Sequence, residues 1–285
     1  MSRRRMSSVI GLLILTMATV TAAEQESRDE ASGEAEQRAG SSPYDRFSAR
    51  VGGFAVRFNT SARVDSDTLG TGTELDLEND TALERSNTEA RLDGHVRFGK
   101  RHRLDYGFIG LRRSGSRVID QQIQFGDEVF EINAELTTRF KNDLYKLAYR
   151  YDVLRKPTWD LGLSFGISAF ALDLGLEAIP AGGSALVAET EDFIAPIPML
   201  GVHTDVKIAK DWYFRAGGEF FDVGVDDYTG KLTDTRAAID WYPFRHVGFG
   251  FGINRMRMTF EDAGAPGLDF TYIYSGTMFY VSFVR

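Results

Sequence analysis

Apolar and polar residues alternate along much of the chain with a period of two, which is the pattern of β-strands with one buried face. Between Leu161 and Ala169, every second residue is Leu, Phe, Ile or Ala, and the residues between them are Gly or Ser. Between Val247 and Ile253, a glycine follows each Val or Phe. One face of these predicted strands is therefore apolar or aromatic, and the other carries glycine, hydroxyl or charged side chains.

We predict an all-β fold of ten strands, with eight or twelve strands as the alternatives. Most of them are longer than the about five or six residues that are usual in globular proteins. The stretch Glu131–Val153 is long enough to contain a bend. The predicted strands are Phe47–Val64, Asn87–Phe98, His102–Ile119, Glu131–Val153, Trp159–Ile179, Ala195–Ala209, Trp212–Val225, Lys231–Tyr242, Val247–Glu261 and Leu268–Val284.

The predicted connections alternate in length along the chain. The short ones are Gly99–Arg101, Leu154–Thr158, Lys210–Asp211 and Pro243–His246. The longer ones are Asp65–Ser86 and Pro180–Ile194, and three intermediate ones are Asp120–Phe130, Asp226–Gly230 and Asp262–Gly267. In an up-and-down antiparallel sheet, alternate connections lie at opposite ends. The short connections therefore belong to one end of the predicted sheet and the longer ones to the other.

Aromatic and charged residues divide between the same two ends. All three tryptophans, Trp159, Trp212 and Trp241, lie beside a short connection. Tryptophan concentrates at membrane interfaces and forms girdles around membrane barrels, and basic residues suit an anionic phospholipid surface. The short connections are basic, with Lys100, Arg101, Arg155, Lys156, Lys210 and Arg245. The longer ones are acidic, with Asp65, Asp67, Glu74, Asp76, Glu78 and Asp80 in the first of them.

The last predicted strand carries a regular pattern of aromatic and small residues. Its spacing is Tyr274-x-Gly276-x-x-Phe279-x-Val281-x-Phe283. This spacing resembles the C-terminal β-signal that assembly machinery reads on outer-membrane β-barrel proteins. The chain departs from the common pattern because Val284 and Arg285 follow the final aromatic residue.

The resemblance to outer-membrane β-barrels covers the range Phe47 to Arg285. Within it, Arg91–Phe98 and the acidic run before it are similar to uncharacterised barrel proteins of Gram-negative bacteria. The resemblance implies a transmembrane antiparallel up-and-down β-barrel in which Leu268–Val284 pairs with Phe47–Val64. It implies a location and a fold, and it does not imply an activity.

The N-terminus has the features of an export signal. Arg3 to Arg5 form a basic region, Val9–Val20 is apolar, and Ala22-Ala23 offers a cleavage site, so we predict a signal peptide over residues 1–23. The apolar run is too short for a spanning helix. Residues 24–46 are acidic and carry few apolar side chains, so we predict a disordered periplasmic segment. The barrel domain would then span residues 47–285 in the bacterial outer membrane, with both termini in the periplasm.

Composition excludes several classes of site and partner. The chain has no cysteine, so it offers neither disulfides nor thiolate metal ligands. It has 33 Lys and Arg against 41 Asp and Glu, a net charge of -8, and no basic stripe, so we predict no nucleic-acid partner. Asp76, Glu78 and Asp80 suggest oxygen ligands for Ca²⁺ or Mg²⁺, but they lack EF-hand spacing, and a solvated acidic loop is the preferred interpretation.

The polar face of the predicted strands collects charges of both signs. In a membrane barrel this face lines the lumen, where buried charges must pair. Ten strands enclose a space that side chains nearly fill, so we prefer an ion-paired plug to a channel for small solutes. The predicted lumen residues are Asp93, His95, Arg97, Asp105, Lys146, Arg150, Asp152, His203, Asp205, Lys207, Arg215, Glu219, Arg236 and Asp240.

Enzymes among small outer-membrane barrels provide a further hypothesis. Lipid A deacylases, palmitoyltransferases and omptin-like proteases of this group use a histidine at the outer leaflet or rim. The four histidines here, His95, His102, His203 and His246, all fall toward the end with the short connections. Asp226-Asp227 resembles an omptin acidic pair but lacks a partner histidine. We therefore predict no catalytic residue, no cofactor-binding residue and no metal site.

These observations lead to three functional hypotheses. The first is a non-enzymatic envelope protein with a plugged lumen and a surface-interaction role. The second is a narrow channel for small solutes or ions, and the third is a lipid A-modifying enzyme or protease at the rim. The expected partners are outer-membrane lipids, lipopolysaccharide and the barrel-assembly machinery, which would bind the C-terminal strand. The sequence leaves the oligomeric state open.

Overall fold

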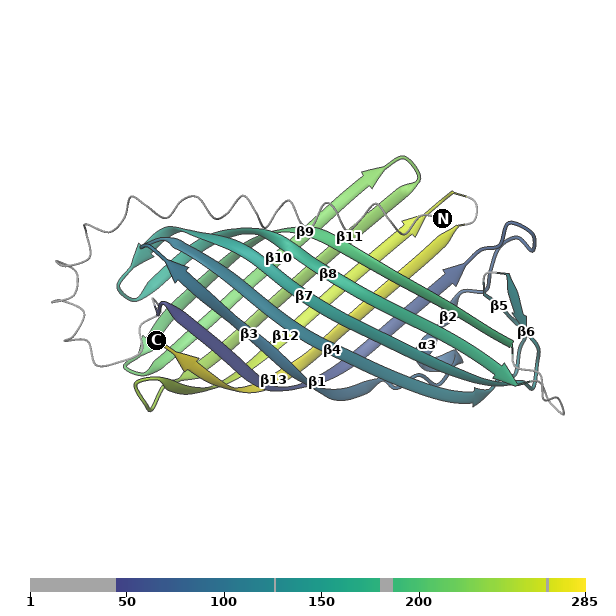
Figure 1. The fold of residues 1–285 in the computed structure, drawn as a ribbon, viewed down its shortest axis with the longest axis horizontal. Helices are drawn as coiled ribbons and strands as arrows, with labels where there is room; N and C mark the ends of the chain where they lie inside the picture. Colours follow the sequence, from purple (N-terminus) through teal and green to yellow (C-terminus); the bar gives the residue numbers. More distant parts are fainter. Residues whose placement is uncertain (1–44, 126, 180–186, 265–266) are drawn as a thin grey trace, which may run out of the picture. The chain divides into compact units, whose positions relative to one another are not determined.

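The computed structural model describes residues 45–125, 127–179, 187–264 and 267–285. The predicted signal peptide and nearly all of the predicted acidic segment lie outside the described residues. Ten long antiparallel strands form one closed barrel (Figure 1). These strands are β1 (Phe47–Val64), β3 (Ser86–Phe98), β4 (His102–Val118), β7 (Glu135–Lys156), β8 (Trp159–Ile179), β9 (Val187–Ala209), β10 (Trp212–Val225), β11 (Tyr228–Trp241), β12 (Val247–Asp262) and β13 (Leu268–Val284).

The first and last strands close the barrel. β13 pairs with β1 without a register shift from Ser48↔Val284 to Val64↔Leu268. Each of the other neighbouring pairs is also consecutive along the chain. The ten-stranded up-and-down barrel and its closure by the C-terminal strand are therefore confirmed. Closure removes the free edges that would otherwise leave backbone donors and acceptors without partners in lipid.

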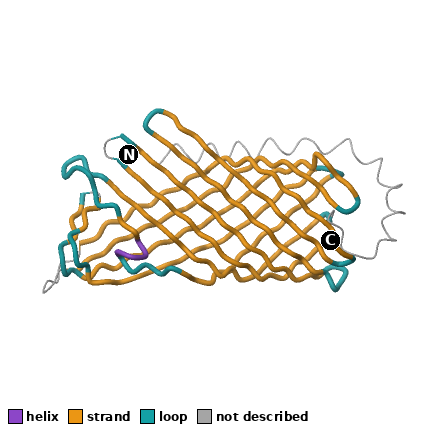
Figure 2. The backbone as a smooth tube through the Cα atoms, turned by 180° about the vertical axis from the view of Figure 1, so that it is seen from behind, coloured by secondary structure: helices purple, strands orange, loops and turns teal. Residues whose placement is uncertain are grey.

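The two ends of the barrel differ as the connection lengths predict. We call the end with the short connections the turn end and the opposite end the loop end. β1 begins and β13 ends at the turn end, where Phe47 also pairs with the last residues of β3. The helix α3 (Leu77–Asp80) and the described residues of the longer connections lie at the loop end (Figure 2).

Side chains alternate along β8 without interruption, but their chemistry changes halfway. Even-numbered residues point into the barrel and odd-numbered residues point outward. Nearer the turn end, the inward residues are Gly162, Ser164, Gly166 and Ser168 and the outward ones are Leu161, Leu163, Phe165 and Ile167. Nearer the loop end, the inward residues are Leu174, Leu176 and Ala178 and the outward ones are Asp173, Gly175 and Glu177.

The same change recurs on other strands and divides the barrel into two parts. It falls near Asn254 on β12, where outward Ile253 is followed by outward Arg255, and near Leu144 on β7, where outward Tyr145 follows outward Asp143. We call the part with apolar outward residues the turn half and the part with polar outward residues the loop half. The prediction that a polar face lines the lumen is correct for the turn half and wrong for the loop half. There the outward side chains are polar and the inward ones form an apolar core, which is the pattern of a soluble protein.

The longest connection is also more ordered than predicted. Residues of the range 65–85 form β2 (Leu75–Asp76) and α3, and Leu75, Leu77 and Leu83 are buried in the core. The side chain of Asp76 caps α3 by accepting a hydrogen bond from the Asn79 amide at 3.0 Å. The prediction of a solvated acidic loop is therefore wrong for this segment, because its leucines fill the mouth of the barrel.

Several strand boundaries differ from prediction, and the two largest differences lie at the starts of β9 and β7. β9 begins at Val187 rather than Ala195, so the connection before it is shorter than predicted. β7 begins at Glu135 rather than Glu131, since Ile123–Phe125 (β5) and Glu128–Phe130 (β6) form a separate hairpin. β7 contains a register shift between Asp152 and Leu154 where it pairs with β8. Among the described residues, no helix is long and apolar enough to cross a membrane.

In the loop half, two pairs of neighbouring strands are not hydrogen-bonded to each other over their full length. The β3–β4 ladder ends at Arg91↔Ile109, and side chains bridge the space beyond it: Asn87 donates to the Arg112 carbonyl at 2.8 Å. The β9–β10 ladder ends at Leu200↔Phe220, although β9 continues toward the loop end along β8. Figure 1 shows β8 and β9 leaving β10 and β11 in different directions beyond this point.

Candidate functional site

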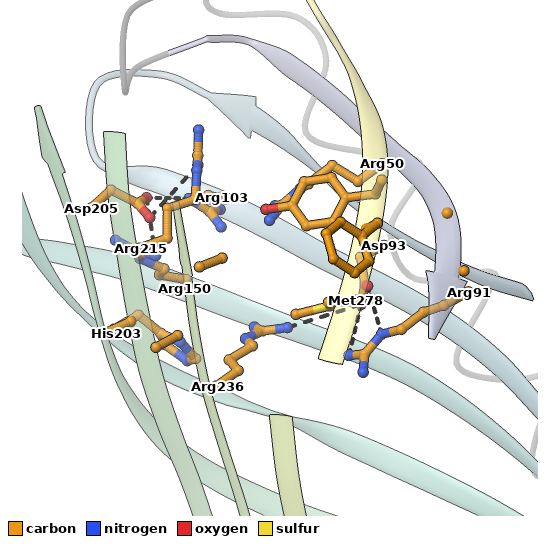
Figure 3. Close-up of a pocket in the computed structure, with 17 residues that line it drawn as sticks. Arg50, Arg91, Asp93, Arg103, Arg150, His203, Asp205, Arg215, Arg236 and Met278 are labelled. Atoms are coloured by element: carbon orange, nitrogen blue, oxygen red, sulfur yellow. Dashed lines mark hydrogen bonds and ion pairs between the residues drawn. The ribbon is translucent and has the colours of Figure 1, made fainter. Parts of the chain in front are cut away.

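The lumen of the turn half contains an ion-pair network centred on Asp205. The Asp205 carboxylate lies 2.9 Å from Arg103, 3.5 Å from Arg150 and 3.6 Å from Arg215. These three arginines come from β4, β7 and β10 and converge on β9 (Figure 3). All four side chains are buried. A carboxylate surrounded by three guanidinium groups is stable only if further acids balance them.

Those further acids lie one step away on the neighbouring strands. Asp152 accepts from Arg150 Nε at 3.0 Å and also pairs with Arg97. Asp105 pairs with Arg103 at 2.6 Å, and Asp240 pairs with Arg215 at 2.5 Å. With Asp160 on β8, which pairs with Arg150, the network links seven strands across the lumen, from β3 to β11. The cavity beside it measures about 40 Å³, which leaves room for little more than water.

The structure brings the predicted lumen residues together. All of them lie on the inward face, and most are buried; Lys207 lies near the turn end with its Nζ 5.6 Å from the Tyr213 ring. Sequence reasoning missed Arg103 and Asp160, which are also buried in the network. Strand parity identifies both, since Arg103 precedes Asp105 by two residues and Asp160 precedes Gly162 by two.

Glycines on the inward face make room for these large side chains. A β-carbon at Gly162 would overlap the guanidinium of Arg150, and one at Gly217 would overlap the imidazole of His203. Gly217 is the Cα partner of His203 across the β9–β10 ladder. At Gly162 and Gly217, the glycine therefore marks a position where a neighbouring strand places a bulky polar side chain.

One cluster in the lumen contains the residue types of a catalytic triad. Gly162–Gly166 reads Gly-Leu-Ser-Phe-Gly, the spacing of the hydrolase nucleophile motif, which sequence reasoning missed. Ser164 Oγ lies 2.8 Å from His203 Nε2, and Glu219 Oε1 lies 3.3 Å from the same nitrogen. A triad requires the serine and the acid on opposite ring nitrogens, and the motif requires a strand-to-helix turn. Here Ser164 lies inside a continuous strand and is buried, so these three residues do not have the arrangement of a catalytic triad.

The loop end lacks the histidine that the enzyme hypothesis requires. Within the described part of the chain, His95 and His203 are buried in the turn half, and His102 and His246 lie at the turn end. Asp226 and Asp227 form the tight turn between β10 and β11, where Asp226 has a φ of 52°. These two aspartates therefore serve a hairpin turn that no histidine approaches.

An aromatic layer separates the charged part of the lumen from the apolar part. Phe54 and Tyr274 are both buried and pack edge to face, with ring centroids 5.8 Å apart. The Arg91 guanidinium lies 5.4 Å from the Phe54 ring centroid on the charged side. Beyond this layer, the core consists of Phe58, Leu75, Leu77, Leu83, Phe125, Phe140, Leu136 and Leu176, among others.

In the described part of the chain, one buried ion pair lies in the apolar part of the lumen. Arg113 on β4 lies 2.5 Å from Glu78 on α3, and Glu78 also accepts from the Thr60 amide at 2.8 Å. The Arg113 guanidinium stacks on the Phe58 ring, 4.2 Å from its centroid. This pair holds the 65–85 segment inside the mouth of the barrel.

The three carboxylates considered as cation ligands already have protein donors. Glu78 binds Arg113 and Thr60, Asp76 caps α3, and Asp80 accepts from the Asp76 amide at 2.8 Å. Their lone pairs are directed to different parts of the segment, so they do not form a common oxygen cage. The prediction of no metal, cofactor or catalytic site remains a prediction.

The outer surface of the loop half has two faces with different charge arrangements. On β4, β7 and β8, basic and acidic side chains pair across the strands. Arg112 lies 2.6 Å from Asp143, Arg139 lies 2.6 Å from Glu177, and Lys141 lies 3.2 Å from Asp173. We call this the paired face. Its basic side chains are exposed, their acidic partners are half-exposed, and the charges neutralise one another.

The opposite face carries arginines without acidic partners. Arg57 on β1 and Arg255 on β12 are both in register with Ser275 on β13, and Arg257 follows two residues after Arg255. All three arginines are exposed, and none forms an ion pair with another residue in the described ranges. We call Arg57, Arg255 and Arg257 the arginine row. An open depression of about 1140 Å³ lies beside it, lined also by Arg85, Thr235 and Thr277.

Similarity to known proteins is limited to the fold. No family model and no curated protein matches the sequence. The outer membrane protease OmpT from Escherichia coli aligns with 86% of this chain and 98% of its own at 11% identity and a TM-score of 0.54. OprG from Pseudomonas aeruginosa covers 87% and 99% at 11% identity and 0.41, and the toluene transporter TodX from P. putida covers 85% and 90% at 8% identity and 0.36.

Proposed function

We propose that this bacterial outer-membrane β-barrel is a sealed, non-enzymatic envelope protein that binds the phosphate groups of lipopolysaccharide through its arginine row. The outward apolar side chains of the turn half form a belt around the barrel, which we call the apolar band. The observation that carries the proposal is the position of Arg57, Arg255 and Arg257 directly beyond this band, without acidic partners. Ala55, Thr277 and Ile253 form the adjoining row on the side of the turn end. Cations at that level meet the headgroups of the neighbouring leaflet.

The proposal places the turn end in the periplasm and the loop end outside the cell. Outward apolar side chains encircle the turn half, including Leu163, Phe165 and Phe251. Trp212 and Trp241 stack outside the barrel at the turn end, with ring centroids 5.9 Å apart. Bacterial outer-membrane barrels have an apolar band flanked by aromatic girdles, and their short turns lie on the periplasmic side. The loop half then stands in the lipopolysaccharide layer.

Arginine suits phosphate recognition because its planar guanidinium forms two parallel hydrogen bonds with phosphate oxygens. Arg57 and Arg255 lie on strands separated by β13, so their backbones are about 10 Å apart. Ser275 between them adds a hydroxyl. A ligand with two phosphates could bind both arginines, with its acyl chains against the apolar band below.

The interior supports a structural rather than a catalytic or conducting role. The ion-pair network fills the turn half, and the apolar core and α3 fill the mouth. The histidines are far from the loop end. Steady unitary currents from the purified protein in planar bilayers would contradict the sealed lumen and favour a narrow channel.

The arginine row is tested by removing its charges and measuring lipopolysaccharide binding. The variant Arg57→Ala/Arg255→Ala/Arg257→Ala should bind fluorescent lipopolysaccharide in detergent micelles at least about tenfold more weakly, because each lost charge-assisted contact is worth more than 1 kcal/mol. Binding is followed by fluorescence anisotropy at low and high salt. With dephosphorylated lipopolysaccharide, the difference in affinity between the variant and the unmodified protein should disappear.

A matched control comes from the paired face. The variant Arg112→Ala/Arg139→Ala/Lys141→Ala removes the same number of positive charges from the same half of the barrel. It should bind within about twofold of the unmodified protein, since those cations are already neutralised by neighbours. Equal losses in the two variants would show that only net charge matters and would refute a site at the arginine row.

A further inference from the structure

A second feature of the loop half concerns the space between β9 and β10. Beyond Leu200↔Phe220, the described residues form no hydrogen bond between these two strands. The comparable space between β3 and β4 is bridged by Asn87 and by the Glu84 amide, which donates to the Ser114 carbonyl at 3.2 Å. Only the β9 space remains without a bridge in the described wall.

The sequence of β9 explains why the ladder stops. Pro196 and Pro198 pair with Ala169 and Ile167 of β8 without a register shift. Proline has no backbone N–H, so it fits where a residue's N–H and C=O positions point away from the paired neighbour. At both prolines these positions therefore point away from β8 and toward β10. Two missing donors on the same edge prevent the β9–β10 ladder from extending past Leu200. The separation is therefore encoded in the strand itself.

An apolar cavity lies behind this space. It has a volume of about 550 Å³, within the range of about 300–1,000 Å³ that is usual for pockets that bind small molecules. Its lining includes one inward side chain from each of six strands: Leu172, Ile197, Phe221, Leu232, Met258 and Phe270. Pro196 and Pro198 line it from the β9 edge. The cavity is thus continuous with the gap in the wall.

The base of the gap lies within the apolar band. Leu200 and Phe220, the last paired residues, are outward and about half exposed, at 51% and 52%. On β9, Pro198, Pro196 and Ile194 continue this apolar outward surface toward the loop end, whereas Asp222 follows Phe220 on β10. A molecule entering at the base comes from the hydrocarbon region of the membrane rather than from water.

We propose that the cavity binds an acyl chain of a membrane lipid, which enters sideways between β9 and β10. The apolar lining provides the free energy of transfer for a hydrocarbon chain that leaves the bilayer edge. The lipid headgroup stays outside, near Lys231, which is exposed, lines the cavity and lies 3.5 Å from Asp222. This inference is independent of the arginine row, which lies on other strands.

Tryptophan fluorescence tests the proposal directly. The three native tryptophans are replaced by Phe, and Leu232→Trp places one reporter in the cavity. The protein is reconstituted without detergent in phosphatidylcholine vesicles whose acyl chains are brominated. Because bromine quenches tryptophan at contact range, we expect this reporter to lose much of its fluorescence relative to unbrominated vesicles.

The matched control is Phe54→Trp, which is also inward and buried but lies outside the cavity. It should keep its fluorescence. Met258→Trp provides a second cavity reporter if Leu232→Trp fails to fold by heat-modifiable gel mobility. Equal quenching of the cavity and control reporters would overturn the proposal. Quenching by free brominated fatty acid but not by brominated lipid would also overturn it.

The route of entry is tested by restoring the missing donors. In the same reporter protein, Pro196→Val/Pro198→Val allows the β9–β10 ladder to extend and should reduce the quenching at position 232. Unchanged quenching would show that the chain does not enter between these strands.

Discussion

The turn half and the loop half of the barrel are built from the same strands with the same side-chain alternation. In the turn half, inward Ser164 and Ser168 face charged neighbours while outward Phe165 faces lipid. In the loop half, inward Leu174 and Leu176 belong to an apolar core while outward Glu177 pairs with Arg139. The register of β7 and β8 does not shift between Asp152↔Gly162 in the turn half and Glu135↔Ile179 in the loop half. Only the chemistry of the two faces is exchanged.

This comparison shows that the surroundings of the wall, and not its backbone, determine which face is apolar. Where lipid surrounds the barrel, apolar side chains point outward and the polar ones must satisfy one another inside. Where water surrounds it, the same strands follow the pattern of a soluble protein. The level at which the pattern changes marks one edge of the membrane on each strand.

The largest expected effect is the loss of the central acid in the turn half. Asp205→Leu should destabilise the barrel by about 3–5 kcal/mol or more, because three buried guanidinium groups lose a shared partner. Urea unfolding in vesicles, followed by fluorescence of the native tryptophans, measures this change. Asp205→Asn, which keeps the shape, should cost a similar amount; a neutral result for both would show that the network is dispensable.

The ion pair of the loop half should respond differently. Arg113→Leu alone should cost about 3–5 kcal/mol, since it leaves Glu78 charged and buried. The double variant Glu78→Leu/Arg113→Leu should recover most of that loss, because apolar residues surround both positions. The same unfolding assay applies. If the double variant were as unstable as the single one, the loop half would depend on charge as the turn half does.

A smaller effect tests where the membrane lies. Phe165→Arg, outward in the turn half, should cost about 2–4 kcal/mol, as expected for a cation near the middle of the bilayer. Thr137→Arg, outward in the loop half and in register with Glu177, should change stability by less than about 1 kcal/mol. Equal costs at the two positions would place both in lipid and remove the distinction between the halves.

The strands could be predicted from the sequence because any strand with one apolar and one polar face alternates with a period of two, whichever face points into the barrel. Phe47–Val64 and Leu268–Val284 were predicted with the bounds that the structure shows, and their pairing followed from the requirement for closure. The inward position of Asp205 and Arg150 followed from parity alone. The general location followed from the terminal strand and the tryptophans beside the short turns.

The functional surfaces were less accessible because they depend on contacts between distant segments. Glu78 resembles any acid in a solvated loop until its segment folds into the barrel beside Arg113, 35 residues away. Arg57 and Arg255 are nearly 200 residues apart and become neighbours only through β13. Pro196 and Pro198 were visible in the sequence, but the cavity behind them is formed by strands on both sides of the gap.

By itself, the sequence determined that the chain forms alternating strands, how apolar and polar residues alternate along each of them, and which strand closes the barrel. These properties are local, since they depend on side-chain period and on turns between neighbouring strands. The tertiary structure alone decided which charges meet, which loop enters the lumen and where the wall opens. Those properties depend on packing between strands that are distant in sequence. The periodicity of side chains along one strand does not show which distant residues come into contact.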